Sequence, residues 1–358
     1  MALMGPRARR LLIGAVLAIL LLAVFFRGLD WPGVVRAIRA ADPLLLAGVV
    51  AMAVLTYLLR AWRWGYLLAP LARVPLMRLF SITNVGFATG LVIPRAGEVV
   101  RPYLVARHHG LKTSAAFASI ILERLFDLIT VLALFAAYLY VLPLPAAQVE
   151  PPGATLKTAG AMAGAAALGV LGLLLWLTYR REPALALADR VFGWLPARLG
   201  GPLGRALHSF TDGLEVLRAS PGHLAAIGVQ SLLVWFAIAL GIHFNNRAFG
   251  VHLPFHSTFF MIGFLTVGVA VPTPGMAGGF HWMYKVALLH FALATDPVTA
   301  AATAAAAALS CHALTNLPVL VLGLVFLGRE GLSLGGVSRL AEQPTADVPE
   351  PSHPVRSA

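Results

Sequence analysis

Long apolar runs, separated by short basic stretches, dominate the hydrophobic pattern of this chain. Six of the runs approach the length of about 20 residues that a helix needs to cross the hydrocarbon core of a bilayer. They predict membrane-spanning helices at about 11–26, 44–59, 116–142, 159–179, 223–244 and 299–327. The pattern therefore predicts an all-α polytopic membrane protein with about six full transmembrane helices.

Two further apolar runs, at about 79–93 and 257–271, are shorter, and each ends in a cluster of proline and glycine. Non-helical backbone at membrane depth is tolerated only where protein surrounds it or where it lines a cavity. We therefore predict two broken, re-entrant helical hairpins that border a site, over about 79–98 and 257–295. Their motif residues are Pro94, Gly97, Pro272, Pro274, Gly275 and Gly278. A cytoplasmic turn for the first cluster and an external loop for the second are the alternatives.

The distribution of basic residues predicts the orientation, because short cytoplasmic loops accumulate Lys and Arg. The N-terminal PRARR and the stretches 60–78, 95–112 and 180–218 are basic, so we expect all four to be cytoplasmic. A first hairpin that dips into the membrane and returns keeps two of these stretches on one side, whereas a full crossing separates them. Both termini are then cytoplasmic, and the segments at 28–43 and 143–158 are external.

Segments outside the apolar runs give weaker predictions. The segment 182–221 suits short amphipathic helices on the inner membrane surface, or a plain connecting loop. The tail 338–358 is rich in Pro, Glu, Ser and Ala and is predicted to be a disordered cytoplasmic tail after a membrane domain over 1–337. No small-residue cleavage site follows the first apolar run, which predicts an uncleaved first helix. We expect a multi-pass protein of the cell inner (plasma) membrane.

Composition agrees with a membrane protein, since 59% of residues are hydrophobic and 12% are charged. The formal net charge of +12 is spread through the loops, which favours anionic lipid headgroups over nucleic acid as partners. The single cysteine, Cys311, excludes an intrachain disulfide and a cysteine metal cluster. His243, His252 and His256 lack companions at metal-ligand spacing. We expect no cofactor and no metal, and no nucleotide-binding or hydrolase motif is present.

The most informative feature is a group of three ionisable residues, Glu123, Arg124 and Asp127, inside the apolar run 116–142. A charge at mid-membrane costs about 2.5–3.5 kcal/mol, so such residues face a protein interior or a wet cavity and have partners. Helical spacing places Glu123 and Asp127 on one face, and Arg124 lies three residues before Asp127, within pairing distance. We therefore predict a polar site inside the bundle.

The two broken segments add further candidates. If a helix restarts near Gly97, Glu98 falls in its first turn, and Arg101 adds a fixed cation suited to phosphate. Asn84 precedes this turn, and His281 and Lys285 follow the second cluster at a spacing that places them on one helical face. Broken helices at corresponding places in two halves are typical of a transporter's midplane site. We expect both segments and the ionisable residues to border one hydrated pocket.

Other polar residues are weaker candidates. The RAWRW sequence at 60–64 has the composition of an interfacial anchor, and anchoring alone is the favoured interpretation. His312 and Asn316 lie on one face of the last predicted helix, where they contact the polar core or hydrogen-bond between helices.

Four ordered motifs, RAWRWGYLL, GLVIPRAGEVVRPYLV, ERLFDLITVLAL and PTPGMAGG, resemble those of the lysylphosphatidylglycerol synthase transmembrane family, also called flippase-like or UPF0104. The resemblance implies a module that moves aminoacylated phosphatidylglycerol between leaflets. Relatives fuse this module to a synthase domain, and we expect none here after Leu340. The matching positions are Arg63, Asn84, Gly97, Glu98, Arg101, Glu123, Arg124, Asp127, Pro274, Gly275 and Gly278. Met276 replaces the second glycine of the family's PGG-type loop, and His281 stands where that loop's acid is expected.

The leading hypothesis is a lipid flippase or transporter that shelters an anionic or glycosylated lipid headgroup and is not an enzyme. Its substrate-binding residues are expected to be Arg63, Asn84, Glu98, Arg101, Glu123, Arg124, Asp127, His281 and Lys285. One alternative is a membrane-embedded transferase acting on a lipid-linked substrate, with Glu98 or Asp127 as its base. Another is a non-transporting accessory subunit in which the broken segments only pack.

Overall fold

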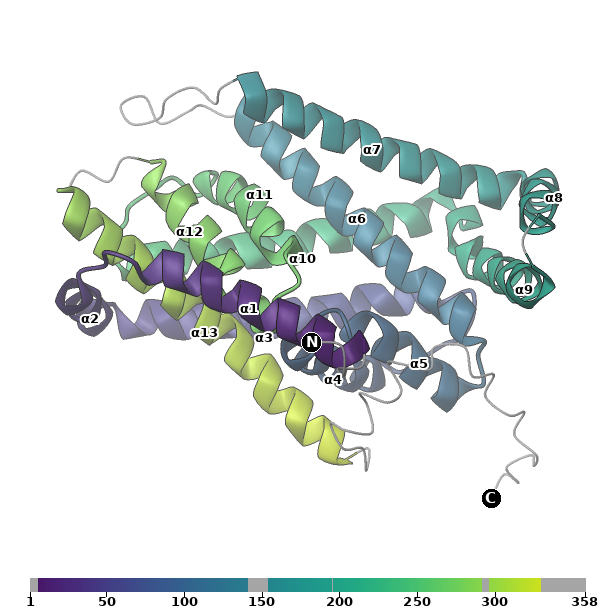
Figure 1. Ribbon diagram of the computed structural model, residues 1–358, viewed down its shortest axis with the longest axis horizontal. Helices are drawn as coiled ribbons and strands as arrows, with labels where there is room; N and C mark the ends of the chain where they lie inside the picture. Colours follow the sequence, from purple (N-terminus) through teal and green to yellow (C-terminus); the bar gives the residue numbers. More distant parts are fainter. Residues whose placement is uncertain (1–5, 141–153, 195, 292–295, 330–358) are drawn as a thin grey trace.

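The structure, a computed structural model, describes residues 6–140, 154–194, 196–291 and 296–329. These residues are helical, with no strand among them, which confirms the all-α prediction (Figure 1). As far as the structure describes them, each of the six long apolar runs lies in one long helix. These helices are α1 (Pro6–Phe26), α3 (Pro43–Leu68), α6 (Thr113–Tyr140), α7 (Ala154–Tyr179), α10 (Pro221–Ala248) and α13 (Pro297–Arg329). The predicted tail lies outside the described residues.

Three of these helices, α3, α10 and α13, are long and apolar enough to cross a membrane. A fourth candidate span is α1 taken together with α2 (Trp31–Ala40), although the two helices are bent by 88°. The charged residues of α6 set it apart from a purely apolar span. The chain is therefore a helical membrane protein, but the predicted count of six full crossings is not confirmed.

Local sequence explains where α3 and α10, the two helices that pack most extensively against each other, begin. Before α3, the side chain of Asp42 accepts hydrogen bonds from the backbone N–H groups of Leu44 and Leu45, and Pro43 occupies the first turn. Before α10, Ser220 accepts from the N–H of His223, with Pro221 in the first turn. Both helix starts thus combine a side-chain cap with a proline that has no N–H to leave unpaired.

Each predicted broken segment is a helical hairpin. The first comprises α4 (Leu76–Val92), a turn, and α5 (Gly97–His109), so the expected helix restart at Gly97 is confirmed. The second comprises α11 (Ser257–Ala270), the short 3-10 helix η2 (Pro274–Met276), and α12 (Gly279–Leu289). We call them the first hairpin and the second hairpin. The breaks predicted at the two Pro/Gly clusters are therefore present.

A pair of glycines lets the two helices of each hairpin approach closely. A Cβ on Gly97 would collide with the backbone of Gly86, and a Cβ on Gly279 would collide with the backbone of Gly268. The arms of each hairpin can pack at this distance only because neither glycine carries a side chain.

The turns of the two hairpins contact each other. Arg95 in the first turn donates a hydrogen bond of 3.3 Å to the carbonyl of Ala270, the last residue of α11. A Cβ on Gly275 in the second turn would lie 3.8 Å from the carbonyl oxygen of Leu91. The two broken segments, 175 residues apart in sequence at this hydrogen bond, therefore contact each other.

The remaining helices lie at the two ends of the bundle (Figure 1). α8 (Arg181–Phe192) and α9 (Ala197–Gly213), followed by the 3-10 helix η1 (Leu214–Arg218), lie at one end, and α2 lies at the other. The predicted helices in the segment 182–221 are confirmed, whereas their place on the inner membrane surface stays a prediction. The short α2 was not predicted.

Candidate functional site

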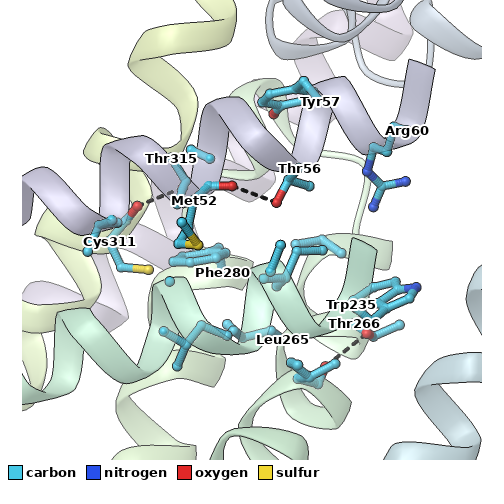
Figure 2. A pocket seen from close by; sticks show the side chains of 18 of the residues that line it. Met52, Thr56, Tyr57, Arg60, Trp235, Leu265, Thr266, Phe280, Cys311 and Thr315 are labelled. Atoms are coloured by element: carbon cyan, nitrogen blue, oxygen red, sulfur yellow. Dashed lines mark hydrogen bonds between the residues drawn. The ribbon is translucent and has the colours of Figure 1, made fainter. Parts of the chain in front are cut away.

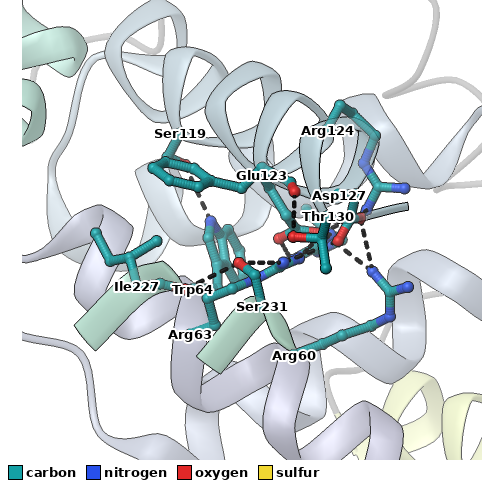
Figure 3. Close-up of polar contacts among 12 residues, drawn as sticks. Arg60, Arg63, Trp64, Ser119, Glu123, Arg124, Asp127, Thr130, Ile227 and Ser231 are labelled. Atoms are coloured by element: carbon teal, nitrogen blue, oxygen red, sulfur yellow. Dashed lines mark hydrogen bonds and ion pairs between the residues drawn. The ribbon is translucent and has the colours of Figure 1, made fainter. Parts of the chain in front are cut away.

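Six charged side chains from three helices converge between α3 and α6 (Figure 3). All are buried except Arg124, whose side chain is 40% exposed. We call this group the arginine cluster. Its members are Arg60 and Arg63 from α3, Arg101 from α5, and Glu123, Arg124 and Asp127 from α6.

Asp127 is the carboxylate on the α3 side of the cluster. It accepts hydrogen bonds from Nη1 of Arg60 at 3.0 Å and from Nη1 of Arg63 at 2.8 Å. The indole N–H of Trp235 in α10 donates to it at 3.1 Å. Arg63 Nη1 also donates to the hydroxyl of Ser231, at 3.0 Å. Three helices, α3, α6 and α10, are thereby joined at one carboxylate.

Glu123 is the carboxylate on the α5 side. Arg101 donates to both of its oxygens, at 2.9 and 2.8 Å, in the bidentate geometry that favours arginine over lysine. Arg124 also donates to Glu123, and its Nη2 lies 3.5 Å from Asp127, which confirms the predicted pairing along α6. Arg124 thus bridges the two carboxylates.

The first hairpin positions Arg101. The stem of its side chain lies against Gly86, where any Cβ would collide with it. Its guanidinium carbon lies 4.4 Å from the ring centroid of Trp64, which is itself fixed by a 2.9 Å hydrogen bond to Ser119. Glycine, indole and carboxylate together leave this arginine little freedom, so the site is preorganised.

The cluster carries more positive than negative charge. Four arginines face two carboxylates, and even with Glu98, which is close enough to attract Arg124, one positive charge remains uncompensated. Among the described residues, Nε and Nη2 of Arg63 and Nε of Arg101 are buried donors without a hydrogen-bond partner. Buried donors of this kind and surplus positive charge favour an anion.

The structure brings together five of the nine predicted site residues: Arg63, Arg101, Glu123, Arg124 and Asp127. Asn84 is buried in α4, but its amide donates to its own helix at the carbonyl of Phe80, and its backbone faces Gly323 of α13. Glu98 lies in the first turn of α5, as predicted, but its side chain is exposed. Neither residue hydrogen-bonds to the cluster.

His281 and Lys285 form a separate group with α1 and α13. Both face Phe25 of α1, which confirms that they share one face of α12. The ring of His281 lies 4.5 Å from that of His312, whose Nε2 is 2.7 Å from the carbonyl oxygen of Gly275. Because a carbonyl only accepts, His312 is the donor. These histidines brace the second turn, so including His281 and Lys285 in the charged core was wrong.

The interpretation of RAWRW as an interfacial anchor alone was also wrong. Arg60, Arg63 and Trp64 are buried, and only Trp62, which is 39% exposed, fits that role. Sequence reasoning missed Arg60, although its i, i+3 spacing to Arg63 was visible. It also missed Ser231 and Trp235, which share one face of α10 but carried no signal distinguishing them from other polar or aromatic residues in an apolar helix.

The arrangement favours binding over acid–base chemistry. Both carboxylates are engaged by arginines, so neither is free to act as a base. An arginine group with surplus charge can hold a phosphate through paired N–H donors. Within the described ranges, no group of three His, Cys, Asp or Glu side chains could hold a metal ion.

Comparison with known proteins gives two findings. The family model for the lysylphosphatidylglycerol synthase TM region matches residues 11–323. The chain is also similar to Glycosyltransferase AglD of Haloferax volcanii, with 27% identity over 385 aligned positions. That alignment covers 97% of this chain and 58% of AglD, so the chain spans little more than half of the relative's length.

Proposed function

This chain belongs to the family of lysylphosphatidylglycerol synthase transmembrane regions, and we propose that it moves a lipid with an anionic headgroup between the leaflets of its membrane. The observation that carries the proposal is the arginine cluster, which places surplus positive charge inside an apolar bundle. Charge at membrane depth is costly and is typical of substrate pathways.

The chemistry of the cluster indicates the headgroup. A lipid phosphate offers several acceptor oxygens and negative charge, which match the unpartnered N–H groups of Arg63 and Arg101. Arg124, the partly exposed member that bridges both buried carboxylates, is the member of the cluster that an arriving phosphate can reach from outside. We assign the first contact with the headgroup to Arg124.

The paired hairpins support a transporter over a static binding protein. Their turns are linked by the hydrogen bond from Arg95 to Ala270 of α11, and Gly275 lies close to Leu91 of α4. Broken helices that meet at a charged site are how several transporter folds build a binding site within the membrane. In our proposal the headgroup passes along the arginine cluster when the two turns separate.

A transferase acting on a lipid-linked substrate is the second candidate, because AglD is named a glycosyltransferase. Against it, Asp127 accepts three hydrogen bonds and Glu123 is held by Arg101 and Arg124, which leaves neither carboxylate as a base. Purified protein that forms a glycosylated lipid from a labelled sugar donor would favour this candidate.

The test of the transport proposal uses purified protein in vesicles containing fluorescent phosphatidylglycerol, with translocation read from loss of protection against an external quencher. We expect Arg124→Ala to lower the rate at least tenfold, since it removes the first headgroup contact. Arg36→Ala, which breaks an exposed ion pair with Asp30 at 3.3 Å, is the matched control and should leave the rate unchanged. Full activity of a folded Arg124→Ala protein would refute the proposal.

A further inference from the structure

An elongated apolar cavity of about 250 Å³ begins at the arginine cluster (Figure 2). One end is formed by Arg60 and Trp235, and the other extends past Phe280 of the second hairpin toward α13. Along α3 the lining residues run from Val49 to Arg60 at helical spacing, on one face of the helix that spans eleven residue steps. At 1.5 Å per residue this face is about 16 Å long, close to the thickness of one leaflet.

At one end the wall carries the polar side chains of Arg60, Trp235 and Tyr57, which lies one helical turn before Arg60. The three threonines that line it each donate back into their own helix: Thr56 to Met52 at 2.8 Å, Thr266 to Ile262 at 2.8 Å and Thr315 to Cys311 at 2.6 Å. Apolar cavities of about 150 Å³ remain dry and bind benzene. A ligand for this cavity is therefore apolar along its length and charged, if at all, only where it reaches Arg60.

We propose that this cavity is a binding site for one acyl chain of a phospholipid whose phosphate occupies the arginine cluster. The inference rests on the proposed function and names the part of the lipid that the cluster alone does not select. Scaling from the benzene cavity, the space accommodates a segment of about ten carbons. A linear chain fits an elongated slot that is parallel to α3, with the phosphate at the Arg60 end.

The cavity selects chain shape more than it adds affinity. A chain that enters it leaves other lipid chains and not water, so there is little hydrophobic driving force. Affinity comes from the phosphate on the arginines, and the walls formed by Phe87, Ile238 and Leu265 admit a thin chain. The site therefore distinguishes a thin, linear acyl chain from a bulkier one.

Crosslinking tests this assignment. The probe is phosphatidylglycerol with a diazirine at mid-chain, mixed into vesicles with the full-length protein, followed by peptide mapping of the adducts. We expect adducts on the cavity faces of α3, α10 and α11, including Met52 and Ile238. Adducts confined to exposed residues such as Leu55 would overturn the proposal. This experiment uses only the wild-type protein, so its result does not depend on whether a variant folds.

A matched pair of variants adds a second readout. Ala53 is buried and lines the cavity, whereas Ala51, on the same helix, is exposed. We expect Ala53→Leu to lower cavity labelling at least fivefold and Ala51→Leu to leave it unchanged. Equal labelling of the two folded variants would contradict the proposal. A competition experiment gives a further check, in which unlabelled lipids displace the diazirine probe. The proposal would also be contradicted if polyprenyl phosphate displaced the probe at a tenth of the concentration that unlabelled phosphatidylglycerol requires.

The results separate this inference from the proposed function. Translocation without cavity labelling means that the acyl-chain site is wrong and that the transport proposal stands. Cavity labelling without translocation by wild-type protein means that the cavity is a fixed lipid site and that the transport proposal fails.

Discussion

The first and second hairpins share one backbone device and differ in the chemistry built around it. In both, two helices cross at a pair of glycines eleven residues apart, Gly86 with Gly97 and Gly268 with Gly279. Arg95 and Met276, one in each turn, are the two non-glycine residues with positive φ in the part of the chain that the structure describes. The polar surroundings of the two crossings are different.

The residue four positions after the second glycine shows the difference most clearly. In the first hairpin it is Arg101, whose stem covers Gly86 and whose guanidinium binds Glu123. In the second hairpin it is Met283, whose Cγ lies 2.9 Å from where a Cβ on Gly268 would be. The same position thus holds a charge in one hairpin and an apolar group in the other.

Beside the second hairpin, neutral side chains hydrogen-bond to one another. The hydroxyl of Tyr284 donates to Asn246 at 2.6 Å and accepts from the amide of Asn245 at 2.8 Å. Asn245 also donates to the carbonyl of Ala307, at 3.0 Å. This neutral network holds the hairpin in place. The side-chain oxygen of Asn245 is buried without a hydrogen-bond partner among the described residues, but an acceptor oxygen does not attract an anion. The comparison therefore supports the proposal that the first hairpin binds the headgroup and that the second hairpin has a supporting role.

The largest expected effect comes from removing a carboxylate of the arginine cluster. Glu123→Ala leaves Arg101 buried and unpaired, and breaking one partner of a buried ion pair costs about 3–5 kcal/mol. We expect a drop of this size in the free energy of unfolding in detergent, measured by denaturant titration. Replacing both partners, Arg101→Met with Glu123→Met, should recover at least half of the loss. A cost below 1 kcal/mol for Glu123→Ala would mean that water reaches the cluster.

Most of the helical architecture was predictable because it depends on local composition. Apolar length located the long helices, and the Pro/Gly clusters located both turns to within a few residues. The ionisable group in α6 was recognised because charge is conspicuous in an apolar run. These features need no knowledge of which helices are neighbours.

The partners of these residues could not be predicted, since they depend on packing between distant segments. Arg60 and Arg63 resemble an anchor until α6 is placed beside α3, because their partner Asp127 follows them by 67 and 64 residues. His281 and Lys285 follow a Pro/Gly cluster just as Arg101 does, but α12 turns them toward α1. Helical spacing gives a residue's face on its own helix, but not the helix that this face contacts.

Adding a methyl group at either glycine crossing is the next largest perturbation. Gly97→Ala and Gly279→Ala each place a Cβ against backbone, which cannot rotate away, and overpacking typically costs about 1–3 kcal/mol. We expect equal losses in the two hairpins if the crossings are equivalent. Gly228→Ala, in α10 with nothing within 4 Å of the added carbon, is the control and should be neutral or slightly stabilising.

Removing the hydroxyl of Tyr284 tests the supporting role of the second hairpin. Tyr284→Phe breaks two hydrogen bonds and leaves the side chains of Asn245 and Asn246 short of a partner, at a cost of about 1–3 kcal/mol. Translocation of phosphatidylglycerol by the folded variant should stay within twofold of wild type, because no charged group changes. A tenfold slower rate at unchanged stability would place the second hairpin in the headgroup pathway.

The smallest effect concerns the two turns themselves. A left-handed backbone costs a non-glycine residue about 1–2 kcal/mol, and both Arg95 and Met276 have φ near 60°. In each turn we therefore expect the glycine variant to be more stable than the alanine variant by about 1 kcal/mol. Comparing glycine with alanine cancels the lost side-chain contacts, including the Arg95 hydrogen bond to Ala270, so only the backbone term remains. If glycine were more stable than alanine at position 276 but not at position 95, the two turns would not be equivalent. The hairpins would then resemble each other only in their glycine crossings.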